Sequence, residues 1–264
     1  MPIILTPFAS GSLCYGHSCQ IADEQKLADY IARVALGQAS NVMRILKDAD
    51  LLPSTPRESC ISGAKKLLTK NNNKDPSHRD GWMFQVMSWI AANVAANVVT
   101  PRPIIRNPHM IHAHKGFDGL QINIDPENLG NLAVVIFEDK ATINPREVIR
   151  NDVWNGFKQL EKGEKDNELV AEISSLLNNG KYNEIEVHKA IDNIMWKKIR
   201  NYRVSITVDD DQLQLENLFK GYNDVVSGDV LRRRGEVYQI KDLRQWMDKL
   251  AQIAINIIET IAYV

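Results

Sequence analysis

The sequence predicts an α/β fold with a mixed central sheet, flanking helices and a helical N-terminal extension. Three features predict it: a helical first part, two strand-like segments at 116–124 and 131–140, and a mixture of helical and strand patterns after them. A chain of 264 residues can form one large domain, or a compact domain with an extension. We expect a helical N-terminal region over 1–78 and the α/β domain with a C-terminal helix over 79–264.

Composition and charge exclude several classes of protein. The chain is 44% hydrophobic and 25% charged, as is ordinary for a globular protein, and its formal net charge is −1. A nucleic-acid contact must therefore be local or be aided by a partner. Cys14, Cys19 and Cys60 are too sparse for a disulfide framework and suit a reducing compartment. With no signal-peptide pattern and no stretch near the roughly 20 apolar residues of a membrane span, we expect a cytoplasmic protein.

Helical periodicity dominates the first part of the chain. Apolar residues recur at helical spacing over 23–48, where Gly37 is a candidate interruption. A second helix is predicted to open at Thr55, with Pro56 at its first position and Glu58 completing a capping box. The polar stretch 71–78 reads as a linker between this part and the rest.

The second part mixes helices with strands. Residues 79–98 are apolar on most sides, which predicts a buried helix. A short strand is predicted at Ile104–Asn107, followed by the strands at 116–124 and 131–140. The remaining expected elements are helices at 144–162, 167–178 and 184–199, a strand at 202–208, and an amphipathic helix from Lys241 whose stripe is Leu243, Trp246, Leu250, Ile253, Ile257 and Ile261.

The strands at 116–124 and 131–140 bring acidic residues together. If they form an antiparallel hairpin with its turn near residue 128, Asp118 lies opposite Glu138, and Lys140 shares their face. The same register pairs apolar residues with one another, namely Leu120 with Ile136 and Ile122 with Val134. That agreement supports the register, because a slip of one residue would reverse every side chain.

Two facing carboxylates at a strand end predict a metal site. Their Cβ atoms would lie roughly 4.5–5.5 Å apart, and like charges so close destabilise a sheet unless a cation compensates. Mg²⁺ (or Mn²⁺) prefers such oxygen ligands and lowers the pKa of a bound water. Lys140 would position the attacking water or stabilise charge in the transition state. The alternative is a surface salt bridge at the end of a hairpin, because an acid two residues before a lysine also occurs at Glu24 and Lys26.

The segments GFDGL and VVIFEDK, with a helix after them, resemble the PD-(D/E)xK nuclease superfamily over roughly 79–209. The resemblance implies that Asp118 and Glu138 bind metal, that Lys140 is catalytic, and that the backbone carbonyl of Asp139 is a further ligand. The side chain of Asp139 is then expected on the other face of the sheet. The family often carries a glutamate on the helix before the sheet, in the pattern G-x-x-F-E. Here Gln85 stands in that place, which favours one metal ion over two.

More narrowly, GFDGL, FEDKAT and LFKGYNDVV resemble the nuclease subunit of the Hachiman antiphage defence system. This resemblance implies a DNA-degrading effector that is partnered by a helicase. We expect broad sequence specificity, since no separate recognition domain is visible. A controlling partner would dock on the N-terminal helices or on the C-terminal helix.

Several polar residues outside the acidic pair are candidate contacts. Gln159, on the helix after the motif, is predicted to support the site, as Gln85 is. The candidate DNA contacts are His114, Arg146, Lys158 and the run Arg232, Arg233 and Arg234, which we place in a glycine-flanked loop. For each of these, a solvated surface is the alternative.

Two other functions stay open on the sequence. The first is a catalytically inactive subunit of the same fold that only binds DNA or a partner, which the glutamine at position 85 favours. The second is a purely structural interaction protein, in which the hairpin charges are solvated surface. The presence of Asp118, Glu138 and Lys140 together opposes the first. The second predicts that removal of Glu138 stabilises the fold or leaves it unchanged, with no effect on any activity.

Overall fold

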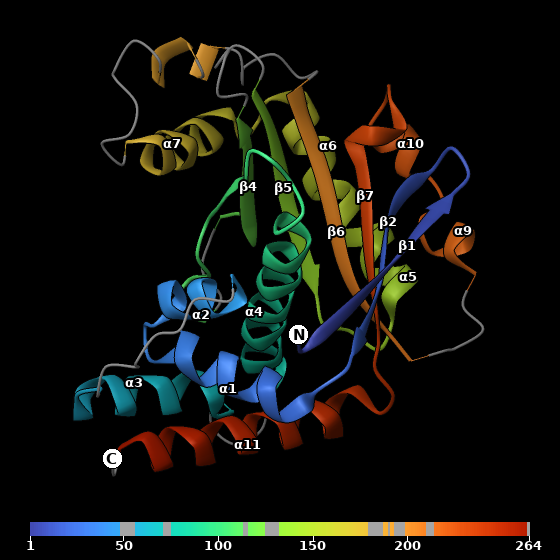
Figure 1. Cartoon of the computed structure of the whole chain (residues 1–264). Helices are drawn as coiled ribbons and strands as arrows, with labels where there is room; N and C mark the ends of the chain where they lie inside the picture. The colour runs from blue at the N-terminus through green and yellow to red at the C-terminus, as the bar shows by residue number, and fades with distance from the viewer. Residues whose placement is uncertain are drawn as a thin grey trace.

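The central feature of the fold is a mixed, curled seven-stranded sheet with helices on both faces (Figure 1). The computed structural model describes residues 1–47, 56–70, 75–112, 116–124, 132–178, 187–189, 191–192, 199–209 and 214–262. The predicted α/β class with a mixed sheet is confirmed. Among the described helices, none combines the length and the apolar character that crossing a membrane requires.

The strands run in the order β1-β2-β7-β6-β5-β4-β3. They are β1 (Ile3–Ser10), β2 (Cys14–Ile21), β3 (Ile104–Ile105), β4 (Gly119–Ile124), β5 (Leu132–Lys140), β6 (Arg200–Val208) and β7 (Arg233–Gln239). Strands β5, β6, β7 and β2 are parallel to one another, whereas β1, β4 and β3 pair antiparallel with their neighbours. Because β4 runs against β5, its start lies at the carboxyl end of β5, and ligands of open α/β sheets bind at such ends.

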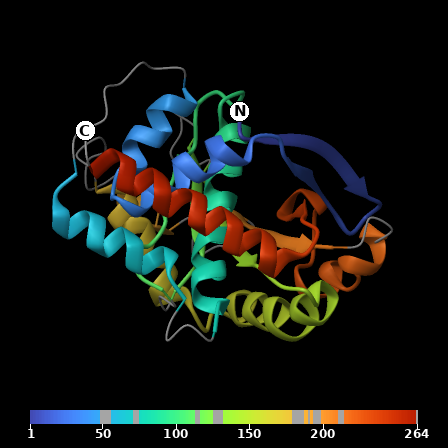
Figure 2. The same ribbon diagram turned by 90° about the horizontal axis from the view of Figure 1, so that it is seen from below.

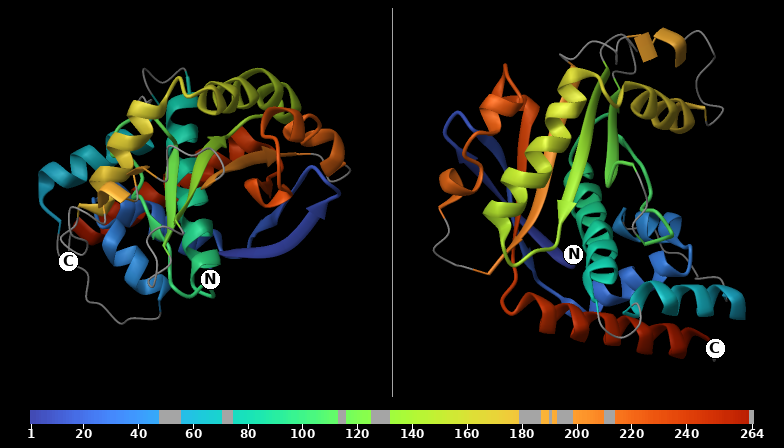
Figure 3. Two further views of the ribbon diagram at one scale, coloured as in Figure 1. Left: turned by 90° about the horizontal axis from the view of Figure 1, so that it is seen from above. Right: turned by 180° about the vertical axis from the view of Figure 1, so that it is seen from behind.

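Helices cover the sheet in two layers (Figures 1 and 3). One layer holds α1 (Glu24–Ala35), α2 (Ala39–Leu46), α3 (Glu58–Leu68), α4 (Ser77–Ala96) and α11 (Leu243–Ala262), whose apolar side chains share a core with Val135 and Phe137 of β5. The other holds α5 (Pro145–Val148), the π-helical turn Ile149–Val153, α6 (Trp154–Lys162), α7 (Asp166–Leu177), α9 (Leu215–Leu218) and α10 (Tyr222–Val225). Figure 2 shows α11 crossing the end of α4, and α11 packs beside α1 and α3. The core that contains α1–α3 thus continues into α4 and α11, and a domain boundary at residue 78 stays a prediction.

The predicted hairpin register is confirmed for the paired residues. Gly119 pairs with Phe137, Leu120 with Ile136 and Ile122 with Val134, so each pair has the predicted sum. The turn at 125–131 lies outside the described residues. Alternate residues of β5 therefore face opposite cores, as strand geometry requires. Of the predicted strands, Ile104–Asn107 shortens to two residues, and 202–208 begins slightly earlier, at Arg200.

Three expectations need correction. The first 21 residues are not helical, because β1 and β2 form a hairpin that adds to the sheet beside β7. The helix expected from Thr55 begins at Glu58, and its N-cap, Arg57, makes no side-chain capping bond, while Thr55 itself lies outside the described residues. The third correction concerns β7, which occupies most of the segment taken for a basic loop.

Other helical predictions are close to the structure. Gly37, with φ of +79°, separates α1 from α2 as expected, since that backbone conformation suits glycine. The C-terminal stripe is right for Leu243 and Leu250, which are buried, while its other members are partly buried at the edge of the same core. Of the helix expected at 184–199, only 187–189, 191–192 and residue 199 are described, and the first two stretches are α-helical.

Candidate active site

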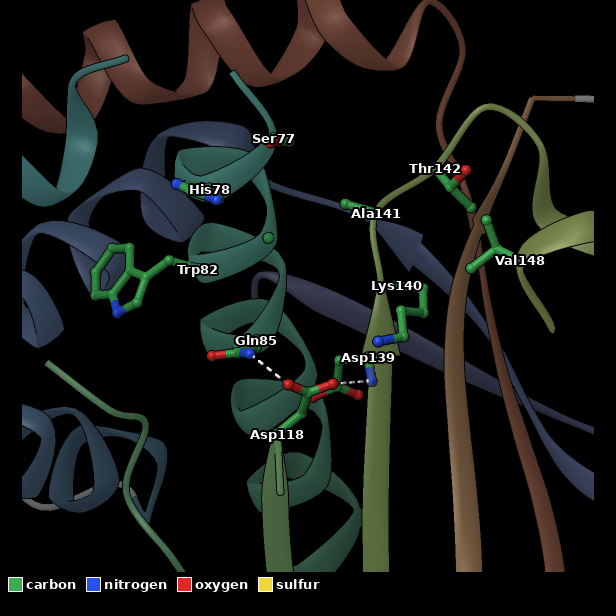
Figure 4. A pocket seen from close by; sticks show the side chains of 11 residues that line it. Ser77, His78, Trp82, Gln85, Asp118, Asp139, Lys140, Ala141, Thr142 and Val148 are labelled. Carbon is green, nitrogen blue, oxygen red and sulfur yellow. Dashed lines mark hydrogen bonds between the residues drawn. The ribbon is translucent and has the colours of Figure 1, made fainter. Parts of the chain in front are cut away.

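The predicted acidic pair and lysine gather at one end of the sheet. Asp118 immediately precedes β4, and Glu138 and Lys140 close β5. If the register continued by one pair beyond Gly119 and Phe137, Asp118 would face Glu138. The buried helix α4 passes beside this end and presents Gln85 to it (Figure 4).

Asp118 is held from two directions. Its Oδ1 accepts a hydrogen bond from Gln85 Nε2 at 2.6 Å, and its Oδ2 accepts one from the backbone N–H of Asp139 at 2.8 Å. Both are drawn in Figure 4. The first bond fixes the carboxylate to α4, and the second ties the start of β4 to the end of β5. Gln85 therefore supports the site as predicted, by orienting a carboxylate rather than by adding a charge.

Glu138 and Lys140 form the second half of the site. Lys140 Nζ lies 3.3 Å from Glu138 Oε2, and their side chains are 31% and 13% exposed. On the α6 side, Gly156 lies beside the glutamate, since a Cβ added there would be in van der Waals contact with Glu138 Oε1, at 3.5 Å. Nothing in the sequence pattern singled out Gly156; its closeness to the motif depends on how α6 packs on the sheet.

The site disfavours the ionised forms of Asp118 and Glu138. Burial, together with repulsion from Asp118, raises the pKa of Glu138 to about 7, although Lys140 opposes the shift. Burial also raises the pKa of Asp118, again against the attraction of Lys140. Burial by itself would lower the pKa of Lys140, but the carboxylates of Glu138 and Asp118 outweigh it and raise that pKa. The lysine is thus held charged, between two acids that lack a full counter-charge.

Asp139 points to the opposite face, as strand alternation predicts. Its Oδ1 accepts a hydrogen bond from Ser88 Oγ of α4 at 2.7 Å, and Ser88 Oγ lies 3.0 Å from Ser205 Oγ of β6. Burial raises the pKa of Asp139 to about 7, and the guanidinium of Arg203 opposes the shift. This buried polar cluster fixes the end of β5 against α4 and β6, so the Asp139 backbone that holds Asp118 is itself anchored. No sequence pattern indicated the two serines, which lie 51 and 66 positions from Asp139.

A cavity of about 310 Å³ opens at this end of the sheet. Asp118, Asp139, Lys140 and the residues after them form one wall, and one stripe of α4 forms the other (Figure 4). That stripe consists of Ser77, His78, Gly81, Trp82 and Gln85. A Cβ added at Gly81 would meet no heavy atom within 4 Å, so the missing side chain leaves open space on the cavity wall.

The oxygen donors here suit one hard divalent cation. Asp118, Glu138 and the backbone carbonyl of Asp139 are the oxygen ligands that Mg²⁺ or Mn²⁺ prefers, and a cation would relieve the repulsion between the two buried acids. Within the described parts of the chain, no group of three His, Cys, Asp or Glu side chains gathers as a metal site. If a cation bound here, the two carboxylates and the carbonyl would be its candidate protein ligands, and water would fill the remaining positions.

Most other predicted contacts lie away from the cavity. Lys158 and Gln159 are exposed on α6, and neither lines the cavity, so the predicted support from Gln159 is not seen. Arg146 donates from Nη1 to the carbonyl of Leu218 at 3.1 Å. His114 falls outside the described residues.

One arginine of the run is buried in the protein interior, and the other two are partly exposed. Arg233 is 3% exposed and donates to four backbone carbonyls, those of Ser12, Leu13, Val226 and Gly228, so a DNA contact is wrong for it. Arg232 pairs with Glu161 at 2.8 Å. Arg234 pairs with Glu236, and DNA contacts of these two arginines stay a prediction.

Comparison with known proteins adds no relative. No family model matches the chain, and no curated protein matches its sequence. The case for a function therefore rests on the residues and on their geometry.

Proposed function

We propose that this protein is a divalent-metal-dependent deoxyribonuclease that hydrolyses DNA phosphodiester bonds. One observation carries the proposal: Asp118 and Lys140 line a cavity at the end of the sheet, and the partly buried Glu138 contacts Lys140 and is repelled by Asp118. Proteins keep such unfavourable arrangements where function requires them. A salt bridge with a structural role would need only one of the acids.

The roles of the residues follow from their chemistry. Asp118, Glu138 and the Asp139 carbonyl would hold Mg²⁺ or Mn²⁺, which supplies a more acidic water and neutralises charge on the phosphate. Gln85 and the Asp139 N–H keep the Asp118 carboxylate in one orientation. Lys140, held charged between the acids, orients the nucleophilic water or stabilises the negative charge that develops on the scissile phosphate.

The biological setting is proposed from the sequence resemblance alone. We place the nuclease in the cytoplasm of a bacterium, as the effector of an antiphage defence complex in which a helicase restrains or delivers it. The layer formed by α1–α3 and α11 is the proposed docking side (Figure 2). Broad sequence specificity fits a cavity without a separate recognition domain.

The alternative function is a catalytically inactive subunit that binds DNA or a partner. Gln85 favours it, because a neutral amide replaces a charged ligand and both Asp118 oxygens already accept hydrogen bonds from the protein. The repulsion between Asp118 and Glu138 favours the enzyme instead, since a binding subunit gains nothing from it.

The test is cleavage of supercoiled plasmid by purified protein with Mg²⁺ or Mn²⁺. The test variant is Glu138→Ala/Lys140→Ala. The matched control is Lys162→Ala/Glu164→Ala, which removes the same two residue types, also two positions apart and paired, from the exposed end of α6. We expect nicking or degradation by the unmutated protein and the control, loss of it in the test variant, and inhibition by EDTA.

Two results would decide against the proposal. Cleavage that survives in the test variant would show that these residues do not carry it. An intact plasmid with every protein, both alone and with the helicase partner, would favour the binding subunit.

A further inference from the structure

We infer that a cationic and apolar groove beside the candidate site binds the strand of a single-stranded polynucleotide and leads it to Asp118 and Lys140. The groove is formed by α3 and by residues 109–112, the segment that precedes β4. Binding of the strand in the groove is independent of the proposed nuclease function, because it depends only on the residues of the groove. Cleavage of the bound strand at Asp118 and Lys140 rests on that proposed function.

The segment 109–112 is fastened across two helices. Trp82 Nε1 of α4 donates to the carbonyl of His109 at 2.6 Å, and the His112 ring Nε2 lies 2.7 Å from the carbonyl of Leu67 in α3. The second contact requires a proton on that nitrogen, since a carbonyl only accepts. The two bonds hold residues 109–112 between α4 and α3, so this side of the groove is anchored to both helices.

The groove has the lining that suits a nucleic-acid strand. Its cavity of about 490 Å³ is lined by Gly63, Lys66, Leu67, Thr69, Lys70, Met110, Ile111 and His112. None of these residues is acidic. Lys66 is exposed and has no ion pair with any described residue, whereas Lys70 also pairs with Asp248 at 2.7 Å. A lysine in a wall without acids attracts phosphate.

Exposed apolar side chains favour a single strand over a duplex. Ile111 is 58% and Met110 is 42% exposed, although both are large hydrophobic residues. Such side chains, with imidazole rings nearby, pack on the faces of unstacked bases. A duplex keeps its base faces stacked inside and presents phosphates and groove edges, so it would leave Ile111 and Met110 without a partner.

Two histidines connect the groove with the active-site cavity. His112 lines the groove and His78 lines the cavity, and their ring centres are 6.5 Å apart. In Figure 4, His78 and Trp82 lie on the opposite side of the cavity from Lys140. A strand that leaves the groove past His112 therefore reaches His78 first and then the stripe of α4 that lines the cavity with Asp118.

The test is binding of a fluorescein-labelled 20-nucleotide oligo(dT) in EDTA, followed by anisotropy. The variants are Lys66→Glu and Ile111→Ala, and the matched control is Lys26→Glu, the same charge reversal at an exposed lysine of α1 that lines neither cavity. We expect Lys66→Glu to weaken Kd at least five-fold and to flatten the salt dependence by about 0.7 in the log–log slope. We expect Ile111→Ala to weaken binding several-fold, the control to stay within two-fold, and a 20-base-pair duplex to compete poorly.

Equal effects of Lys66→Glu and Lys26→Glu, or a duplex that binds as tightly as oligo(dT), would overturn the inference. A second assay, hydrolysis of bis(p-nitrophenyl) phosphate with Mn²⁺, distinguishes failure of the groove inference from failure of the proposed nuclease function. That substrate is too small to use the groove, so it reports on the active site alone. We expect the groove variants to hydrolyse it as the unmutated protein does. If no protein hydrolyses it while Lys66 still governs oligo(dT) binding, the nuclease proposal fails and the groove stands.

Discussion

Replacement of Glu138 by glutamine should stabilise the protein while it abolishes activity. The side chain is 13% exposed, lies close enough to Asp118 for repulsion, and has burial as the main cause of its raised pKa. Glutamine keeps the shape and removes the charge. Lys140 loses one partner in the variant, but it is 31% exposed and retains the attraction of Asp118.

The size of the effect follows from the pKa of Glu138. A carboxyl whose pKa rises from 4.5 to about 7 on folding costs roughly 3 kcal/mol of stability once it is ionised in both states, at about 1.4 kcal/mol per pH unit. Because the folded pKa is the higher one, the folded state binds more protons between pH 4.5 and 7. Stability is therefore lost as the pH rises through that window. Because Glu138 is coupled to Asp118, about 3 kcal/mol is an upper limit for the gain in unfolding free energy that Glu138→Gln produces at pH 8. This gain in stability should vanish near pH 4.

The assay is urea denaturation in EDTA at pH 8 and at pH 4.5, with Glu161→Gln as the control. Glu161 is a partly buried glutamate of α6 that is paired with Arg232, so its removal should destabilise. A Glu138→Gln variant no more stable than the unmutated protein at pH 8 would refute the reasoning. A gain of equal size at both pH values would refute its electrostatic cause.

Three further predictions concern the same end of the sheet. Ser88→Ala should cost about 1–3 kcal/mol in urea denaturation, because it removes one of the two hydroxyl donors of the buried Asp139 carboxylate; an unchanged midpoint would contradict this. Gly81→Ala should stabilise α4 by up to about 1 kcal/mol. Gly81→Leu should fill the cavity and slow plasmid cleavage without unfolding the protein. Full activity of the leucine variant would exclude the cavity as the substrate path. Mg²⁺ or Mn²⁺ should raise the melting temperature more at pH 8 than at pH 5, where Glu138 is protonated, and should not do so in Glu138→Gln; an equal rise in both proteins would place the ion elsewhere.

The hairpin was predictable because its information is local. Alternating apolar residues in β4 and β5 specify which face is buried, and a single register pairs them. The positions of Asp118, Glu138 and Lys140 follow directly from that register. The opposite direction of Asp139 follows from the same alternation, although its serine partners do not.

The missed elements depend on distant parts of the chain. β1 has an irregular burial pattern, with exposed Ile4 and Pro7, so it lacks the strict alternation that marks a strand. In β7, arginine and glutamate occupy positions where a buried strand ordinarily has apolar residues. The structure tolerates Glu236 there because Arg203 and Arg234 neutralise its charge. Burial opposes ionisation, yet those guanidiniums lower the pKa of Glu236 to about 2. Such pairings are decided by the tertiary fold and leave no periodic signal.

The parallel pairing of β2 with β7 has a consequence for how the protein is made. His17 pairs with Glu236 across 219 positions of sequence, so β2 can pair with β7 only after nearly the whole chain has been synthesised. Contacts of such separation form late and slowly. During synthesis the N-terminal hairpin will therefore emerge with an unpaired edge, which is a surface for chaperones or for premature aggregation. Yield of native protein should thus depend on the rate at which the ribosome delivers the last third of the chain.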